Sequence, residues 1–228
     1  KPSEHASATI LELMHLVQEA GFPDGVVNVV TGLGVDTGSA LTKHPLVRRI
    51  AFTGGGEGAK SVIKNSAENL AQVSLELGGK SPNIIFEDAD IGSAVNGVIA
   101  GIFAASGQSC VAGSRLLVQD TVYDEFLTAL KTRAASIIIG DPLDPTSEMG
   151  PMATQTQLTL VERMVATAIA QGAELIHGGK RAAVAGDGWY FEPTILAVDD
   201  NQCSIMQEEV FGPVASIMRF KDEAEALA

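Results

Sequence analysis

The stretch "VRRIAFTGGGEGAKSVIKNSAENLAQVSLELGG", residues 47–79, changes its local pattern twice. Residues 47–55 have the character of a strand that ends in consecutive glycines. Residues 57–70 place apolar side chains at helical spacing, and residues 73–77 return to a strand pattern. A strand, a helix and a second strand in this order predict an α/β fold with a parallel sheet.

The same alternation extends in both directions from this stretch. Upstream we expect a helix over residues 7–21, a short buried strand over 25–32 and a short helix over 38–43. Downstream we expect strands over residues 82–86 and 115–119, and helices from about residue 90, over 123–136 and over 154–172.

A domain junction is expected within "LELGGKSP", residues 75–82. Gly78 and Gly79 end a strand there, and Pro82 prevents a helix from continuing through the segment. We therefore expect two domains, residues 1–77 and residues 78–228.

Composition excludes several classes of function. The chain has 228 residues, of which 46% are hydrophobic, so it can bury a sizeable core. Its net charge of −13 disfavours nucleic acid and anionic membrane surfaces as partners. No apolar run is long enough to span a bilayer, and residues 1–10 lack the apolar core of a signal peptide.

Cys110 and Cys203 are the only cysteines in the chain. Two cysteines cannot build a disulfide framework, and neither has a second cysteine or a histidine at metal-ligand spacing. We expect no metal site and a reducing compartment, the cytoplasm.

Two glycine-rich turns follow expected strands. "GLGVDTG", residues 32–38, differs from the G-x-G-x-x-G dinucleotide fingerprint because its last glycine comes one residue too late. "FTGGGEGAK", residues 52–60, can either bring backbone amides to a phosphate at a helix N-terminus or simply form a tight turn. Neither turn matches G-x-x-x-x-G-K-[ST], so kinase or ATPase chemistry is disfavoured.

Cys110 lies in "FAASGQSCVAGSR", residues 103–115, among small and polar residues. This setting suggests a turn that enters a helix, where free amides lower the pKa of a thiol and could receive an oxyanion. The alternative is an inert buried cysteine. The histidines show no sign of converging on Cys110, so a nucleophile would need another partner.

Carboxylates offer that partner. Glu76 ends an apolar strand, where burial would raise its pKa toward that of a general base. Glu208 and Glu209 precede "VFGPV" and, taken alone, are better explained as a solvated acidic pair.

Several motifs together resemble the NAD(P)-dependent aldehyde dehydrogenase superfamily over essentially the whole chain. They occur in the order and spacing of that family: "KPSE", "FTGG", "LELGGKSPNIIF", "GQSCVAGSR", "GDPLDPTSEMGPM", "YFEPTIL" and "QEEVFGPV". The resemblance implies the aldehyde dehydrogenase fold, cut at both ends. It consists of part of a Rossmann-like cofactor-binding domain, residues 1–77, followed by most of an α/β catalytic domain, residues 78–228.

The resemblance also implies roles for single residues. Cys110 matches the catalytic nucleophile and Glu76 the general base. Glu209 matches the carboxylate that binds the nicotinamide ribose, and Phe211 packs near the nicotinamide. The remaining matches to cofactor-binding positions are Lys1, Ser3, Glu4, Gly34, Gly38, Thr53, Gly54, Gly55 and Leu77.

NAD is the implied cofactor, with NADP as the alternative, and an aldehyde is the implied small-molecule substrate. The thiolate attacks the aldehyde, hydride transfer leaves a thioester, and Glu76 activates water to release the acid. The full-length parent is implied to be a homodimer or homotetramer. Its oxyanion site is implied to need an asparagine from upstream of Lys1, so we expect this chain alone to turn over slowly.

The sequence departs from the family pattern in the glycine turn. Gly55 stands where the family usually has serine, and Ala59 aligns with the usual last glycine, with Gly58 just before it. Two other functions stay open: an acylating relative that uses coenzyme A, which Glu76 argues against, and a non-catalytic homologue. The sequence does not select the aldehyde.

Overall fold

The computed structural model describes residues 1–184 and 186–228. The chain divides into two structural units. The first unit spans Lys1–Gly78 and the second Gly79–Ala228. The division falls one residue from the junction expected after Leu77.

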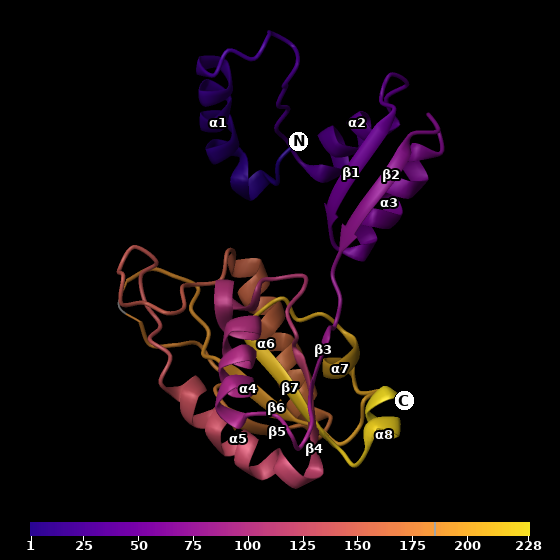
Figure 1. Ribbon diagram of the computed structural model, residues 1–228. Coiled ribbons are helices and arrows are strands. Elements are labelled where there is room, and N and C mark those ends of the chain that lie inside the picture. Colours follow the sequence, from indigo (N-terminus) through magenta and orange to yellow (C-terminus); the bar gives the residue numbers. More distant parts are fainter. Residues whose placement is uncertain (185) are drawn as a thin grey trace. The chain divides into compact units, whose positions relative to one another are not determined.

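The first unit contains a two-stranded parallel sheet. Strands β1 (Arg49–Gly54) and β2 (Gln72–Leu77) pair directly, and helix α3 (Gly56–Ser66) connects them. Figure 1 shows α3 lying alongside both strands. The strand–helix–strand pattern of residues 47–79 is therefore present as predicted. The other helical segments of this unit are a short 3₁₀ turn at Glu4–Ala6, α1 (Ser7–Glu19), a π-helical turn at Gly34–Gly38, and α2 (Ser39–Lys43).

The buried strand predicted over residues 25–32 is absent. These residues form turns and irregular backbone, and Val26, Val27 and Val30 are exposed. A strand needs a neighbour to satisfy its backbone groups, and none of the strands among the described residues pairs with this segment. Valine-rich composition alone was therefore a misleading signal.

The second unit is built on a five-stranded sheet with the order β3-β4-β7-β6-β5. All neighbouring strands run parallel except β5 and β6, which pair antiparallel. The strands are β3 (Pro82–Ile85), β4 (Arg115–Gln119), β5 (Glu174–His177), β6 (Thr194–Ala197) and β7 (Val214–Phe220).

Helices cover both faces of this sheet (Figure 1). Along β4, Leu116 and Val118 belong to one buried cluster and Leu117 to the other, as expected when side chains alternate across a strand. The first cluster includes helices α4 (Ile91–Val98) and α5 (Asp120–Ala135), and the second includes α6 (Gln155–Ala170) and α7 (Ser204–Gln207). Helix α8 (Glu223–Leu227) follows β7. Strands β3 and β4 and helices α4, α5 and α6 agree with the sequence prediction.

Within residues 1–184 and 186–228, every helix is too short or too polar to cross a bilayer. The same residues hold no cluster of three or more histidine, cysteine, aspartate or glutamate side chains that could bind a metal ion.

Candidate active site

The loop that carries Cys110 begins with three consecutive residues in the left-handed region. Ala105, Ser106 and Gly107 have φ values of 49°, 56° and 71° and reverse the chain after the helical segment that follows α4. The buried Ser106 hydroxyl donates hydrogen bonds to the carbonyls of Gly150 and Pro151, at 2.8 and 3.1 Å. The Gln108 side-chain oxygen accepts a hydrogen bond from the Ala153 amide at 3.1 Å. The loop is thus fixed against residues 150–153.

Cys110 is exposed on this loop, in a turn that leads into β4. The prediction that the turn enters a helix is wrong. The Ala112 amide donates to the Ser109 carbonyl, and the chain then extends toward the buried strand residues 116–118. A helix N-terminus therefore does not supply amides to this thiol. Its accessibility fits a nucleophile and does not fit the buried position of the alternative considered above.

The loop that carries Glu209 packs against the Cys110 loop. A β-carbon built on Gly107 would lie 2.0 Å from the Gly212 carbonyl oxygen, so the two backbones touch there. The Gln157 side-chain amide, on α6, donates to the carbonyls of Val210 and Phe211 at 2.9 and 3.1 Å. These contacts fix Glu209, Phe211 and the Cys110 loop within one framework.

The two adjacent glutamates have different surroundings. Glu208 is exposed, as a solvated acidic residue would be. Glu209 is half-buried, and its Oε1 atom is buried without a hydrogen-bond partner among the described residues. A buried acceptor of this kind is costly unless a donor from elsewhere satisfies it. Phe211, 37% exposed and with a φ of 53°, follows on the same loop.

Lys80 and Arg115 are half-buried residues of the second unit that were not singled out from the sequence. Lys80 Nζ and Arg115 Nε are both buried without a hydrogen-bond partner in the described part of the chain. Burial and the neighbouring Arg115 charge lower the pKa of Lys80 to about 8, while Glu209 and Cys203 act in the opposite direction. The position of Lys80 directly after Gly78 and Gly79, where the chain enters β3, was the available signal.

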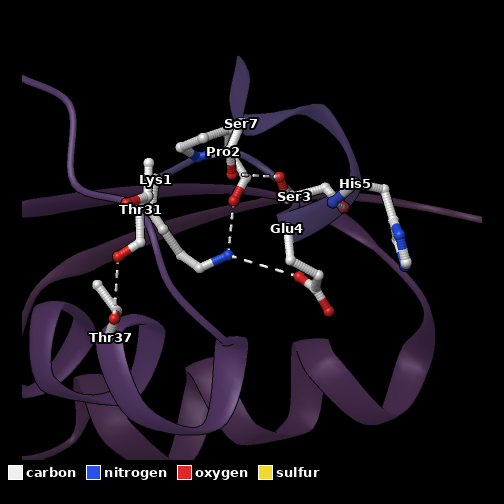
Figure 2. A network of polar contacts seen from close by, with 8 residues as sticks. All are labelled: Lys1, Pro2, Ser3, Glu4, His5, Ser7, Thr31 and Thr37. Atoms are coloured by element: carbon white, nitrogen blue, oxygen red, sulfur yellow. Dashed lines mark hydrogen bonds and ion pairs between the residues drawn. The ribbon is translucent and has the colours of Figure 1, made fainter. Parts of the chain in front are cut away.

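In the first unit, the Lys1 side chain lies beside Pro2 and Glu4 (Figure 2) and also close to Gly38. Its ammonium donates to the Pro2 carbonyl at 2.6 Å and lies 3.8 Å from a Glu4 carboxylate oxygen. Its Cδ atom would lie 3.9 Å from a β-carbon built on Gly38. Ser3 begins the following 3₁₀ turn, with its hydroxyl accepting from the His5 amide.

Figure 2 also shows Thr37, whose hydroxyl donates to the Thr31 carbonyl at 3.2 Å. This bond closes the segment that contains Gly34, at the start of the π-helical turn. The structure therefore brings Lys1, Glu4 and Gly38 together and places Gly34 on the adjoining turn.

The remaining predicted residues of this unit meet where β1 and β2 end. Thr53 pairs with Glu76, and Gly54 pairs with Leu77. Gly55 follows as the N-cap residue of α3. Carboxyl ends of neighbouring parallel strands are a common place for ligands, so their common location suits a cofactor site.

Glu76 was expected to be buried, but its side chain is exposed within the first unit. Side chains alternate along a strand, and Glu76 points away from the face that α3 covers. The general-base role therefore does not gain support from desolvation within residues 1–78.

Two glycines of the turn pack against the Phe52 ring. A β-carbon on Gly54 or on Gly58 would lie 2.7 Å from Cζ of the Phe52 ring, so both glycines accommodate that ring. Ala59 is buried on the inner face of α3. Gly58 thus leaves room for the Phe52 ring.

Comparison with known proteins identifies the family. The aldehyde dehydrogenase family profile matches residues 1–228. The chain is 53% identical over 230 aligned residues to (Z)-2-((N-methylformamido)methylene)-5-hydroxybutyrolactone dehydrogenase of Acinetobacter baylyi. It is 42% identical over 228 residues to retinal dehydrogenase 2 of Mus musculus. These alignments cover 100% of this chain but 46% and 44% of the relatives, so the chain spans less than half of their length.

Solved structures agree with this assignment. Betaine aldehyde dehydrogenase from Staphylococcus aureus, in complex with NAD+, superposes with a TM-score of 0.95 at 41% identity, covering 99% of this chain and 45% of that one. PnpE, also in complex with NAD, gives a TM-score of 0.95 at 43% identity, covering 99% and 47%. The expected fold and the resemblance drawn from the motifs are confirmed. The chain belongs to the aldehyde dehydrogenase family.

Proposed function

We propose that the intact gene product oxidises an aldehyde to a carboxylic acid with NAD as cofactor, and that Cys110 is its nucleophile. One observation carries the proposal: the exposed Cys110 lies on a loop whose backbone touches the loop of the half-buried Glu209. A nucleophile and a carboxylate that can bind a ribose, on adjoining loops, suit a reaction that transfers a hydride from an aldehyde to a nucleotide cofactor.

The residues fit the cofactor in each unit. The half-buried Glu209 side chain would accept a hydrogen bond from a ribose hydroxyl through the part of its carboxylate that solvent reaches. Lys1 and Glu4, beside Gly38, present an ammonium and a carboxylate that can hydrogen-bond a second ribose. Thr53, Gly54, Gly55 and Leu77 would line the path of the pyrophosphate at the strand ends. When bound, NAD supplies the hydride acceptor.

The protein's own chemistry has two stages. The Cys110 thiolate adds to the aldehyde carbon, and the resulting thiohemiacetal becomes a thioester when it loses its hydride and the proton of its hydroxyl group. Glu76 then takes a proton from water, whose oxygen attacks the thioester carbon. The carbon–sulfur bond breaks, the acid leaves and the thiolate is restored.

Glu76 favours water over coenzyme A as the acyl acceptor, because the acylating alternative needs no base to activate water. The relatives carry names that refer to quite different substrates, from a hydroxybutyrolactone to retinal and betaine aldehyde. We therefore propose the reaction without selecting the aldehyde. We include a cytoplasmic location and a homodimer or homotetramer in this proposal, the former because both cysteines are free thiols.

The test is NADH formation by the intact gene product with a panel of aldehydes, with and without coenzyme A. The proposal predicts aldehyde-dependent NADH formation without coenzyme A, and its loss in Cys110→Ala with NAD binding retained. NADH formation that requires coenzyme A would support the acylating alternative. Turnover that survives in Cys110→Ala and disappears in Cys203→Ala would contradict the assignment of the nucleophile.

A further inference from the structure

Ser106 is a buried polar residue in the loop that carries Cys110. It is 4% exposed, and its backbone is left-handed, with φ 56° and ψ 32°. Its hydroxyl donates to the Gly150 carbonyl at 2.8 Å and to the Pro151 carbonyl at 3.1 Å. A hydroxyl carries a single proton, so the two carbonyls share it. Ser106 thus ties the Cys110 loop to residues 150–151 through a bond that water does not reach.

The backbone conformation at Ser106 is one that glycine adopts more readily. A residue with a β-carbon is disfavoured in the left-handed region, whereas glycine is not. Such a residue persists only where its surroundings hold it. The hydroxyl bond is the contact that serine makes here and that neither glycine nor alanine could make. The shape of the loop therefore depends on this bond.

The segment that receives the bond is itself anchored. Met152 is 2% exposed, and its amide donates to the Trp189 carbonyl at 2.9 Å. The amide of the next residue donates to the Gln108 side chain at 3.1 Å. Two side chains of the Cys110 loop therefore contact residues 150–153. Cys110 is exposed and follows shortly after them, so its position is set by the backbone that these contacts hold.

We propose that Ser106 is a positioning residue for the nucleophile, whose hydroxyl bond to Gly150 and Pro151 holds the left-handed turn that orients the Cys110 thiol toward the aldehyde. This inference rests on the proposed function, in which Cys110 is the nucleophile. Ser106 is buried and does not touch the reacting atoms. A small displacement of a reacting atom lowers the rate steeply, so losing the bond should slow attack on the aldehyde.

The experiment uses the intact gene product and two substitutions that separate the hydroxyl from the backbone strain. Ser106→Ala removes the hydroxyl but keeps the β-carbon, so the strain remains. Ser106→Gly removes both. The control is Thr194→Val, which removes another buried hydroxyl, on β6, that donates to the Glu192 carbonyl at 2.8 Å. Denaturant melts rank the stabilities, and kinetics are measured where every variant is folded.

Both Ser106 substitutions should lower kcat/KM for the aldehyde about tenfold at saturating NAD, the loss expected for one hydrogen bond. Ser106→Gly should do so although it is more stable than Ser106→Ala. The dissociation constant of NAD, measured by calorimetry, should stay within about twofold of the wild-type value. The pH dependence of Cys110 alkylation by iodoacetamide should not change, because a small reagent reaches an exposed thiol in many orientations. Thr194→Val should lose stability and keep the wild-type kcat/KM.

Wild-type kcat/KM in Ser106→Gly would overturn the inference, because strain alone would then explain a loss in Ser106→Ala. A tenfold loss in Thr194→Val would also overturn it, since the effect would follow general stability. A shifted alkylation profile, or NAD binding weakened as much as kcat/KM, would assign Ser106 a role other than orienting the thiol. If Ser106→Ala does not fold, Ser106→Gly and Thr194→Val decide.

A parallel Cys110→Ala variant separates this inference from the proposed function. If Cys110→Ala still turns over the aldehyde, Cys110 is not the nucleophile and the inference fails with that assignment. If Cys110→Ala is inactive while both Ser106 variants keep the wild-type kcat/KM, only the inference fails.

Discussion

The backbone of Gly107 lies directly against the carbonyl of Gly212. A β-carbon on Gly107 would be 2.0 Å from that oxygen, and its φ of 71° is itself unfavourable for other residues. This contact joins the loop of Cys110, three residues after Gly107, to the loop of Glu209, three residues before Gly212. The spacing between Cys110 and Glu209 therefore depends on the absence of a methyl group at Gly107.

Gly107→Ala should disrupt this spacing. The strain and the displaced backbone should cost at least about 2 kcal/mol of the free energy of unfolding. Displacement of Cys110 should lower the turnover rate on the order of a hundredfold. Chemical denaturation and steady-state kinetics measure the two effects. Gly97→Ala, in α4, is the control, because a β-carbon there meets nothing within 4 Å. Equal behaviour of the two variants would refute the role given to the Gly107 contact.

Ala105 adopts a left-handed conformation, with φ 49° and ψ 31°, and its side chain is exposed. Glycine would relieve the strain, so Ala105→Gly should raise the free energy of unfolding by about 1 kcal/mol without lowering the turnover rate. Ala104→Gly is the matched control, because Ala104 is exposed with a φ of −56° and ψ of 147°. That substitution should be neutral or slightly destabilising. Denaturant melts that rank the variants in the opposite order would exclude strain at Ala105.

The lowered pKa of Lys80 makes the free energy of unfolding depend on pH. It also determines that this free energy rises with pH. Between about pH 8 and its ordinary value of 10.5, the unfolded chain binds more protons at this residue than the folded chain. Its contribution to the free energy of unfolding therefore rises with pH across that window, by up to about 3 kcal/mol. Below pH 8 the penalty of the buried ammonium is fully present.

Denaturation of Lys80→Met across this pH range checks the expectation. The difference in stability between wild type and variant should shift in favour of the wild type as the pH rises. Lys131→Met, at an exposed lysine of α5, should leave the wild-type pH dependence unchanged. A constant difference between wild type and Lys80→Met would show that Lys80 does not titrate in this window.

Glu4 should select NAD over NADP. A 2′-phosphate near its carboxylate would be repelled, although Lys1, 3.8 Å from Glu4, offsets part of that charge. Because Glu4 is largely exposed, we expect about 1 kcal/mol of discrimination, and Glu4→Gln should improve kcat/KM for NADP relative to NAD by about fivefold. Glu12→Gln, on an exposed position of α1, should leave the ratio as it is. An unchanged ratio in Glu4→Gln would remove Glu4 as a selector.

The sequence predicted the regular parts of the fold because their patterns are local. The sequence pattern of residues 47–79 indicates a strand, a turn, a helix and a second strand, and the sequence of β4 is a short apolar run. The strand predicted over residues 25–32 was wrong because an apolar segment becomes a strand only when it pairs with a neighbouring strand. Composition does not encode that pairing. The prediction of a helix after Cys110 was wrong because the chain extends into β4 there.

The sequence named candidate site residues but not the contacts that hold their loops in place. Motif resemblance pointed to Cys110 and Glu209, but nothing in the sequence marked Gly107 as the point where their loops touch. Lys80 was missed for a related reason. Lysine is usually exposed, and only the structure shows that the Lys80 ammonium is buried.

The most direct test of the covalent mechanism is to trap the acyl-enzyme in Glu76→Gln. This substitution keeps the size of the side chain but removes the base that activates water, so deacylation should slow while the thioester still forms. The measurement is rapid-quench mass spectrometry of the intact Glu76→Gln gene product mixed with NAD and an aldehyde that the wild type oxidises. The account predicts a burst of NADH and an acyl adduct that peptide mapping places on Cys110. An adduct on another residue, or NADH formation in the burst with no adduct at all, would contradict it.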